Sequence, residues 1–196
     1  MEKPASKKIY IMMNKPCGYV CSAVSDSHKT VYELLPAPLR SLAQNAKRGK
    51  RLHTIGRLDC DTSGLLLFTT DGDFSNYLTR PQNHIPKTYE AVIKTPVEEP
   101  AQAEYISRAS KGVMLPAEKK APEQQSAGAQ LEFITPTFCR ITVTEGKFHE
   151  VRRLFQALGN EVVELKRISF GKYKLPKELN PGEFKAINPE SSRFEV

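Results

Sequence analysis

The segment GRLDCDTSGLLLFTTDGD, residues 56–73, places a short apolar run between two groups of carboxylates. The run Leu65–Thr69 predicts a buried strand, and Asp71 after it is predicted to cap a short helix. Asp59 and Asp61 precede the strand, in a stretch whose glycines permit a turn. The segment therefore predicts a buried strand that begins beside a polar loop.

Hydrophobic periodicity divides the rest of the chain into short strands and a few helices. Strands are expected at residues 9–13, 19–24, 51–55, 89–94, 131–134, 138–143, 161–168 and 184–187, and helices at 31–35, 73–79, 97–109 and 148–158. The strands dominate and do not alternate regularly with helices. This pattern favours an α+β fold over repeated βαβ units.

A chain of 196 residues supports one sizeable core or two small lobes that share a cleft. The domain is predicted to span residues 9–190, with an N-terminal tail at 1–8 and a C-terminal tail at 191–196. Within it, residues 116–129 are polar and rich in alanine, glutamine and proline, which predicts a loop or a flexible insertion. Residues 41–50 are expected to form an exposed loop.

The sequence contains neither an apolar run of about 20 residues nor an apolar segment behind its basic N-terminus, so neither a membrane helix nor a signal peptide is predicted. We therefore expect a cytoplasmic protein. Cys17, Cys21, Cys60 and Cys139 are expected to be free thiols in that compartment. No second cysteine or histidine pair stands at zinc-ligand spacing, so no metal site is predicted.

Basic residues outnumber acidic ones, which gives a formal net charge of +7. The excess is uneven, because residues 40–57 contain no acidic residue. The basic residues of this block are Arg40, Lys47, Arg48, Lys50, Arg51 and Arg57. Such a block suits a polyanion, since each side chain that neutralises a phosphate also releases counterions. A solvated basic loop is the alternative interpretation.

Two familiar kinds of aspartate site are disfavoured by the residues around Asp59. The segment begins with the spacing of an EF-hand calcium loop, but Thr70 stands where a bidentate glutamate is required. An aspartyl phosphatase of the haloacid-dehalogenase type needs an apolar strand before the first aspartate, where Gly56 and Arg57 stand here. The remaining interpretation is one catalytic aspartate in a loop whose neighbours hold its shape.

Three further motifs accompany residues 56–73: NKPCGYVCS at 14–22, KTYEAVI at 87–93 and EGKFHEVRRLFQALGNEVVELKRISFGKYKL at 145–175. In this order the four motifs resemble those of the RNA pseudouridine synthases, in particular the family that modifies single uridines in ribosomal RNA. The last motif is most similar to the small-subunit (16S) type, and a large-subunit (23S) target is the nearest alternative. The resemblance implies a catalytic domain with a long mixed or antiparallel sheet and no cofactor.

The resemblance makes Asp59 the catalytic nucleophile, Tyr89 the residue that stacks on the target base and Arg152 the cation paired with Asp59. Pseudouridylation detaches uracil from ribose and rejoins it through carbon, so it needs a group that attacks or supports the anomeric carbon and later departs. An arginine keeps such a carboxylate ionised, and an aromatic ring compensates the uridine for leaving its stack. Leu165 is expected to form a wall of the uracil pocket.

Basic residues in and between the motifs are the candidates for RNA contact. Phosphate contacts are expected for Lys15, Arg57, Lys87, Lys166 and Arg167, together with Lys47, Arg48, Lys50 and Arg51 of the basic loop. Arg153 points about 100° away from Arg152 on the helix and is expected on RNA phosphate or in a structural ion pair. His149 could contact RNA, but it is interpreted as a surface histidine.

The expected partner is ribosomal RNA or an assembly intermediate of a ribosomal subunit, and the expected state is a monomer. Many relatives carry a small RNA-binding domain before the catalytic one. Here the first strand follows the N-terminus almost directly, so that domain is expected to be absent. A noncatalytic RNA-binding protein, which would not need Asp59, is the alternative from a different class.

Overall fold

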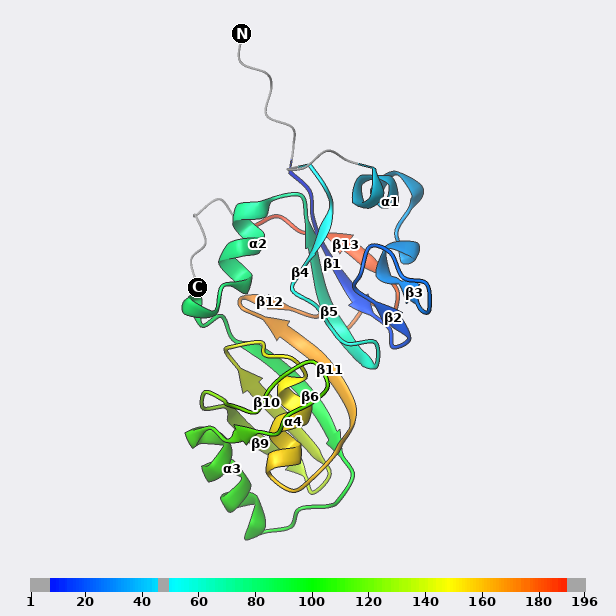
Figure 1. Ribbon diagram of the computed structural model, residues 1–196. Coiled ribbons are helices and arrows are strands. Elements are labelled where there is room, and N and C mark those ends of the chain that lie inside the picture. Colours follow the sequence, from blue (N-terminus) through cyan, green and yellow to red (C-terminus); the bar gives the residue numbers. More distant parts are fainter. Residues whose placement is uncertain (1–7, 46–49, 190–196) are drawn as a thin grey trace.

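Most strands of the computed structural model, which describes residues 8–45 and 50–189, join one mixed sheet (Figure 1). The strands of this sheet are β1 (Tyr10–Lys15), β4 (His53–Ile55), β5 (Thr62–Thr69), β6 (Lys87–Ile93), β9 (Gln130–Thr135), β10 (Phe138–Val143), β11 (Val162–Phe170), β12 (Tyr173–Lys174) and β13 (Phe184–Ala186). The remaining strands form two small pairs, β2 (Tyr19–Val20) with β3 (Lys29–Thr30) and β7 (Met114–Leu115) with β8 (Gln124–Gln125). The helices are α1 (Ala37–Gln44), α2 (Gly72–Thr79), α3 (Ala101–Lys111) and α4 (Glu150–Ala157), with 3-10 helices η1 (Val31–Leu34) and η2 (Pro81–Asn83).

The nine-stranded sheet has the order β13–β1–β5–β11–β6–β10–β9, with β4 beside β5 and β12 beside β11. Strands β5 and β11 are parallel, with Thr62 opposite Leu165 and Gly64 opposite Arg167. All other strand pairs described in this sheet are antiparallel. The predicted α+β class with a long mixed sheet is confirmed. The predicted domain boundaries at residues 8–9 and 190–191 stay predictions.

Gly64 allows the two parallel strands to approach each other. Its φ is +100°, in the region that favours glycine, and a Cβ at this position would lie 2.2 Å from the carbonyl oxygen of Arg167. Further along, β5 pairs with β4 instead, with Thr69 opposite His53. Figure 1 shows β5 and β11 meeting near the middle of the molecule. The loop before β5 therefore lies where the parallel contact begins.

Strand β5 is buried on both faces, which explains its unbroken apolar run. Leu66 and Phe68 pack in one hydrophobic cluster, which also contains residues of β6, β10 and α4. Leu65 and Leu67 point the opposite way, into a second cluster that contains Phe74 of α2. A strand covered on both faces needs apolar residues at every position rather than at alternate ones.

Helices α2, α3 and α4 lie where the sequence predicts helices and differ at some ends, whereas no helix was predicted at α1. The Asp71 carboxylate accepts hydrogen bonds from the backbone N–H groups of Asp73 (3.1 Å) and Phe74 (3.4 Å), so the predicted cap is confirmed. The helix expected from residue 97 begins at Ala101, after Pro100, because proline is tolerated at the start of a helix but not inside it. Within the described residues, none of the helices has the length and apolarity needed to cross a membrane.

Two predicted boundaries near the N-terminus are wrong. The strand expected at 19–24 ends at Val20, because a turn rich in serine follows it. The loop expected at 41–50 is helical as far as Gln44, since α1 buries Ala43 completely against the core. Lys47 and Arg48 lie outside the described residues.

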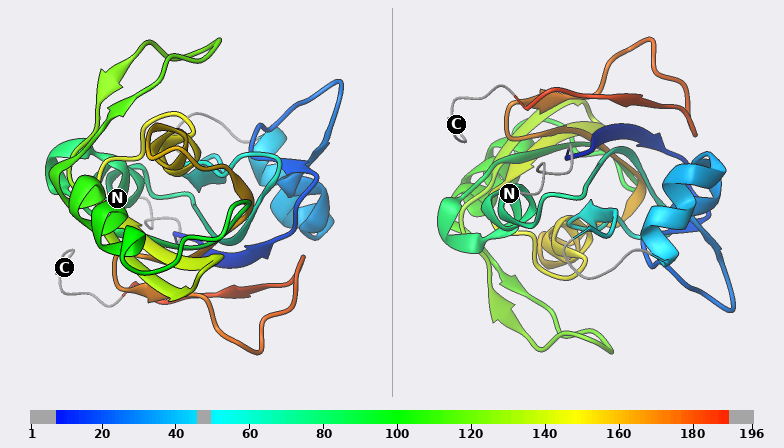
Figure 2. Two further views of the ribbon diagram at one scale, coloured as in Figure 1. Left: turned by 90° about the horizontal axis from the view of Figure 1, so that it is seen from below. Right: turned by 90° about the horizontal axis from the view of Figure 1, so that it is seen from above.

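Most of residues 116–129, predicted as a loop or a flexible insertion, belong to an ordered hairpin. Strands β7 and β8 pair with each other, and Glu118 and Ala121 form a further bridge near the tip. We call residues 114–125 the β7–β8 hairpin, which Figure 2 shows projecting from the body of the molecule. Its carbonyl oxygens accept hydrogen bonds from Arg153 of α4, a partner that local composition does not reveal.

Candidate active site

Asp59 lies in the loop between β4 and β5, and the buried side chain of Lys15 holds this loop in shape. The Lys15 Nζ donates hydrogen bonds to the carbonyl oxygens of Asp59 (3.0 Å), Cys60 (3.4 Å) and Thr62 (2.8 Å). Burial lowers the pKa of Lys15, and the carbonyl groups replace water around the ammonium. Lys15 is 0% exposed, so the prediction that it contacts an RNA phosphate is wrong.

A pocket of about 260 Å³ opens beside this loop. Its walls also come from β6, β11 and the beginning of α4, and they bring together Asp59, Tyr89, Arg152 and Leu165. Tyr89 and Leu165 are close because β6 and β11 are neighbours in the sheet, with Tyr89 opposite Arg167 and Leu165 opposite Ala91. Residues from three separate sequence motifs therefore share one site.

Tyr89 and Leu165 form a largely buried part of the pocket wall, with 9% and 5% of their surfaces exposed. Burial raises the pKa of the Tyr89 phenol, and the charge and hydrogen bond of Arg167 oppose that rise. The phenol is therefore protonated at neutral pH. The arrangement offers an aromatic ring and an aliphatic side chain to a flat base.

The Asp59 carboxylate is 36% exposed and faces the pocket. Burial raises its pKa above the ordinary value of an aspartate. His149 is the strongest opposing influence, followed by Arg152 and Arg57, whereas neighbouring Asp61 adds to the rise. Two opposing effects therefore act on the pKa of Asp59: burial raises it, and the nearby cationic side chains lower it.

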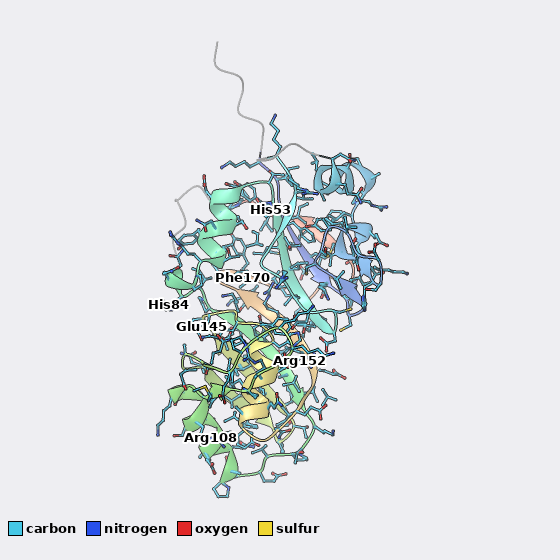
Figure 3. All side chains as sticks on the ribbon, in the orientation of Figure 1. His53, His84, Arg108, Glu145, Arg152 and Phe170 are labelled. Carbon is cyan, nitrogen blue, oxygen red and sulfur yellow. The ribbon has the colours of Figure 1, made fainter. Side chains whose placement is uncertain are left out.

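Arg152 lies at the pocket, but the ion pair predicted between it and Asp59 is wrong. Its Nη2 is 2.9 Å from the Asp61 Oδ2, and its Nη1 donates to the carbonyl oxygen of Val162 at 2.9 Å. Figure 3 shows Arg152 near the middle of the molecule, between its upper and lower parts. These two contacts direct the Arg152 guanidinium to Asp61 rather than to Asp59. The charge of Arg152 still lowers the pKa of Asp59 without a direct ion pair.

Lys87 and Arg167 are buried cations that line the same pocket. The Lys87 Nζ donates to the carbonyl oxygens of Ile85 (3.0 Å) and Glu145 (3.4 Å), and burial, followed by the charge of Arg167, lowers its pKa to about 8. The Arg167 Nε donates to the Leu65 carbonyl oxygen at 2.8 Å. Lys87 and Arg167 can therefore contact RNA only where it enters the pocket.

Two other predicted RNA contacts are placed away from the pocket. Arg153 is 0% exposed and donates to carbonyl oxygens of the β7–β8 hairpin, so a contact between it and RNA phosphate is wrong. Arg153 has a structural role, as the second interpretation expected, but its partners are carbonyl groups and not a carboxylate. Lys166 points to the opposite face of the sheet from its neighbours Leu165 and Arg167, because side chains alternate along a strand.

The remaining basic candidates lie on the surface. Arg57 is exposed at the pocket, two residues before Asp59. Lys50 and Arg51 are exposed as well, and the Arg51 Nε donates to the carbonyl oxygen of Ala43 at the end of α1. Their contact with RNA stays a prediction.

His149 is the site residue whose position the sequence analysis missed. It lies at the N-terminal end of α4, with its Nε2 3.5 Å from the Asp59 Oδ1 and its Nδ1 2.9 Å from the Glu118 Oε2. One feature of the sequence indicated this position: His149 comes three residues before Arg152, so both belong to the end of α4 that faces the Asp59 loop. Glu118 gave no such signal, since it comes from the β7–β8 hairpin.

The sequence of this chain is similar to those of known proteins. Residues 9–157 match the RNA pseudouridylate synthase family. The ribosomal small subunit pseudouridine synthases A of Salmonella typhimurium and Escherichia coli K12 are each 41% identical to this chain over 181 residues. Each alignment covers 92% of this chain and 71% of the relative.

Solved structures show the same similarity. One described as a pseudouridylate synthase has a TM-score of 0.79 and 37% identity, covering 93% of this chain and 71% of its own. Human RNA pseudouridylate synthase domain containing 1 shares the fold, with a TM-score of 0.55 and 14% identity. Among residues 8–45 and 50–189, no cluster of three or more potential metal ligands is present. The family match over residues 9–157 and the 41% identity to the two relatives show that the chain belongs to the RNA pseudouridylate synthase family.

Proposed function

We propose that the chain converts a single uridine of small-subunit ribosomal RNA into pseudouridine, with Asp59 as the nucleophile. The observation that carries the proposal is the meeting of Asp59, Tyr89 and Leu165 in one pocket, which is large enough for a pyrimidine ring. The choice of the small subunit is supported by the names of relatives that are 41% identical to this chain.

The reaction breaks the bond between ribose C1′ and uracil N1 and forms one between C1′ and C5. Asp59 attacks or supports C1′ while the base is detached, and it departs when C5 takes its place. The proton on C5 is lost and N1 gains one, so the overall change is an isomerisation without an oxidant or a reductant. Tyr89 stacks on the base, which offsets part of the cost of removing the uridine from its helix.

We also propose that the protein acts as a cytoplasmic monomer on ribosomal RNA or on an assembling subunit. Ribosomal RNA is the substrate class named for its relatives, and the formal charge of +7 suits a polyanionic partner. Size-exclusion chromatography with light scattering measures the oligomeric state. Separate reactions with free RNA and with subunits distinguish the two forms of substrate.

The test uses the purified protein with 16S and 23S ribosomal RNA, free or in subunits, in the presence of EDTA. Carbodiimide modification followed by primer extension then maps each pseudouridine. We expect one new site in 16S RNA with the wild type and none with Asp59→Ala. A site in 23S RNA would overturn the choice of subunit. Binding without any product from the wild type would indicate a noncatalytic RNA-binding protein.

A further inference from the structure

His149 is fixed by its backbone and by its neighbour rather than free on a surface. Its φ of 47° and ψ of 33° place it in the left-handed region, which residues other than glycine adopt uncommonly. Its ring stacks on Phe148 with 3.8 Å between centroids. The His149 carbonyl oxygen also accepts a hydrogen bond from the Arg153 N–H at 2.9 Å. These constraints hold the imidazole in one orientation.

The imidazole lies between two carboxylates from distant parts of the chain. Nε2 faces the Asp59 Oδ1 at 3.5 Å, and Nδ1 faces the Glu118 Oε2 at 2.9 Å. All three side chains are about one-third exposed, at 30% for His149, 36% for Asp59 and 30% for Glu118. Ionised carboxylates only accept hydrogen bonds, and an imidazole donates from both nitrogens only as an imidazolium. The arrangement therefore suits a cation that contacts both.

Glu118 reaches His149 because the β7–β8 hairpin is fastened to the same helix. Arg153 donates hydrogen bonds to the carbonyl oxygens of Pro116 (2.8 Å) and Pro122 (2.6 Å), on the two arms of the hairpin. Its guanidinium is completely buried. The beginning of α4 thus holds the hairpin through Arg153 and receives its carboxylate through His149.

We propose that Glu118 is a positioning residue that acts through His149 on Asp59. Glu118 orients the imidazole, and the imidazole orients the Asp59 carboxylate and favours its ionised form. This inference rests on the proposed role of Asp59 as nucleophile. If the three residues formed only a partly exposed ion-pair cluster, removing Glu118 would have little effect, since such pairs contribute little.

The charged surroundings of Asp59 make the inference measurable as a pH dependence. His149 lowers the pKa of Asp59 more than any other neighbour does, so its loss raises that pKa and moves the acid limb of the reaction to higher pH. The other titratable and charged groups that act on Asp59, belong to its loop or lie against it are Arg57, Asp61, Arg152, Lys15, Cys17, Cys21, Cys60 and Tyr89. These groups are unchanged in the variants below.

The experiment compares Glu118→Gln, His149→Asn and the control Glu123→Gln, an exposed glutamate of the same hairpin. Asparagine is chosen at 149 because it tolerates the left-handed backbone. Single-turnover rates are measured with saturating ribosomal RNA across the acid limb. Glu118→Gln and His149→Asn are expected to lower the rate about tenfold or more, because a carboxylate that is no longer held in position reacts more slowly, and to move the acid limb upward. Glu123→Gln is expected to match the wild type.

The double variant Glu118→Gln/His149→Asn separates action through His149 from any other role of the hairpin. If Glu118 acts through His149, the double variant is no slower than His149→Asn alone. An additional loss in the double variant would overturn the inference, and so would a wild-type rate and pH profile in Glu118→Gln. Asp59→Ala runs in parallel, because its retained turnover would contradict the proposed function itself. Thermal melting confirms that each variant is folded.

Discussion

Burial influences the protonation of Asp59 more than any single neighbour does, because desolvation is the largest of the effects on its pKa. Its folded-state pKa is raised, whereas the unfolded value is about 3.9. Between these values the folded chain binds more protons than the unfolded chain, so the free energy of unfolding falls as pH rises through this window. At neutral pH the ionised carboxylate therefore costs stability, as expected where a group is kept for chemistry.

Replacing this carboxylate is predicted to stabilise the fold. Asp59→Asn should raise the Tm by roughly 1–3 °C at pH 7. The gain should disappear as pH falls below about 4, where both states of the wild type are protonated. Calorimetry at several pH values measures it. Asp26→Asn serves as the control, because it makes the same change at an exposed aspartate outside the pocket and should give no gain. A lower Tm for Asp59→Asn at pH 7 would contradict the prediction.

Tyr89 offers a second test at the residue scale. Tyr89→Phe should keep stacking on the base and lose only what the hydroxyl does, whereas Tyr89→Leu should lose the aromatic face. Stacking is worth about 1–3 kcal/mol per base, so the leucine variant should lose roughly 5- to 160-fold in base binding and rate. Single-turnover kinetics with titrated RNA separate binding from rate. Equal activity of Tyr89→Leu and the wild type would remove Tyr89 from the site.

At the scale of elements, the sequence indicates what is local and misses what depends on distant partners. Strand β5 was predictable because its apolar run suits burial on both faces. The β7–β8 hairpin was not, because its polar composition is that of a loop and its hydrogen bonds to Arg153 come from a distant helix. Asp59 and Tyr89 were recognisable from their motifs. The link from Glu118 to His149 was not, since it requires the hairpin to be folded.

The role of Arg153 in the hairpin is testable by local exchange. Arg153→Met should leave four buried or partly buried carbonyl groups without this donor, three in the hairpin and that of Phe148, at a cost of about 1–3 kcal/mol each. We expect hydrogen exchange over residues 114–126 to accelerate by at least about tenfold, while the amides of β5 change much less. Arg108→Met, at an exposed arginine of α3, is the matched control. Unchanged exchange in the hairpin would show that Arg153 does not order it.

At the scale of the whole molecule, the basic block at residues 40–57 is the feature not explained by the pocket. Changing Lys47, Lys50, Arg48 and Arg51 together to Ser should weaken RNA binding and flatten its salt dependence. Each lost phosphate contact should reduce the slope of log affinity against log salt by roughly 0.7–0.9. Filter binding at several salt concentrations gives the slope, and chemistry at saturating RNA should survive. An unchanged slope would mean that the block is a solvated surface.

The parallel contact of β5 with β11 also determines when the site becomes complete during synthesis of the chain. The hydrogen bond between the Ser63 hydroxyl and the Leu165 carbonyl spans 102 residues of sequence. Closing so large a loop is entropically costly, and contacts of this kind form late in folding. A nascent chain that has emerged only as far as α4 has made Asp59, Tyr89 and Arg152 but not the strand that joins them. The pocket is therefore complete only once β11 has been synthesised and has paired with β5.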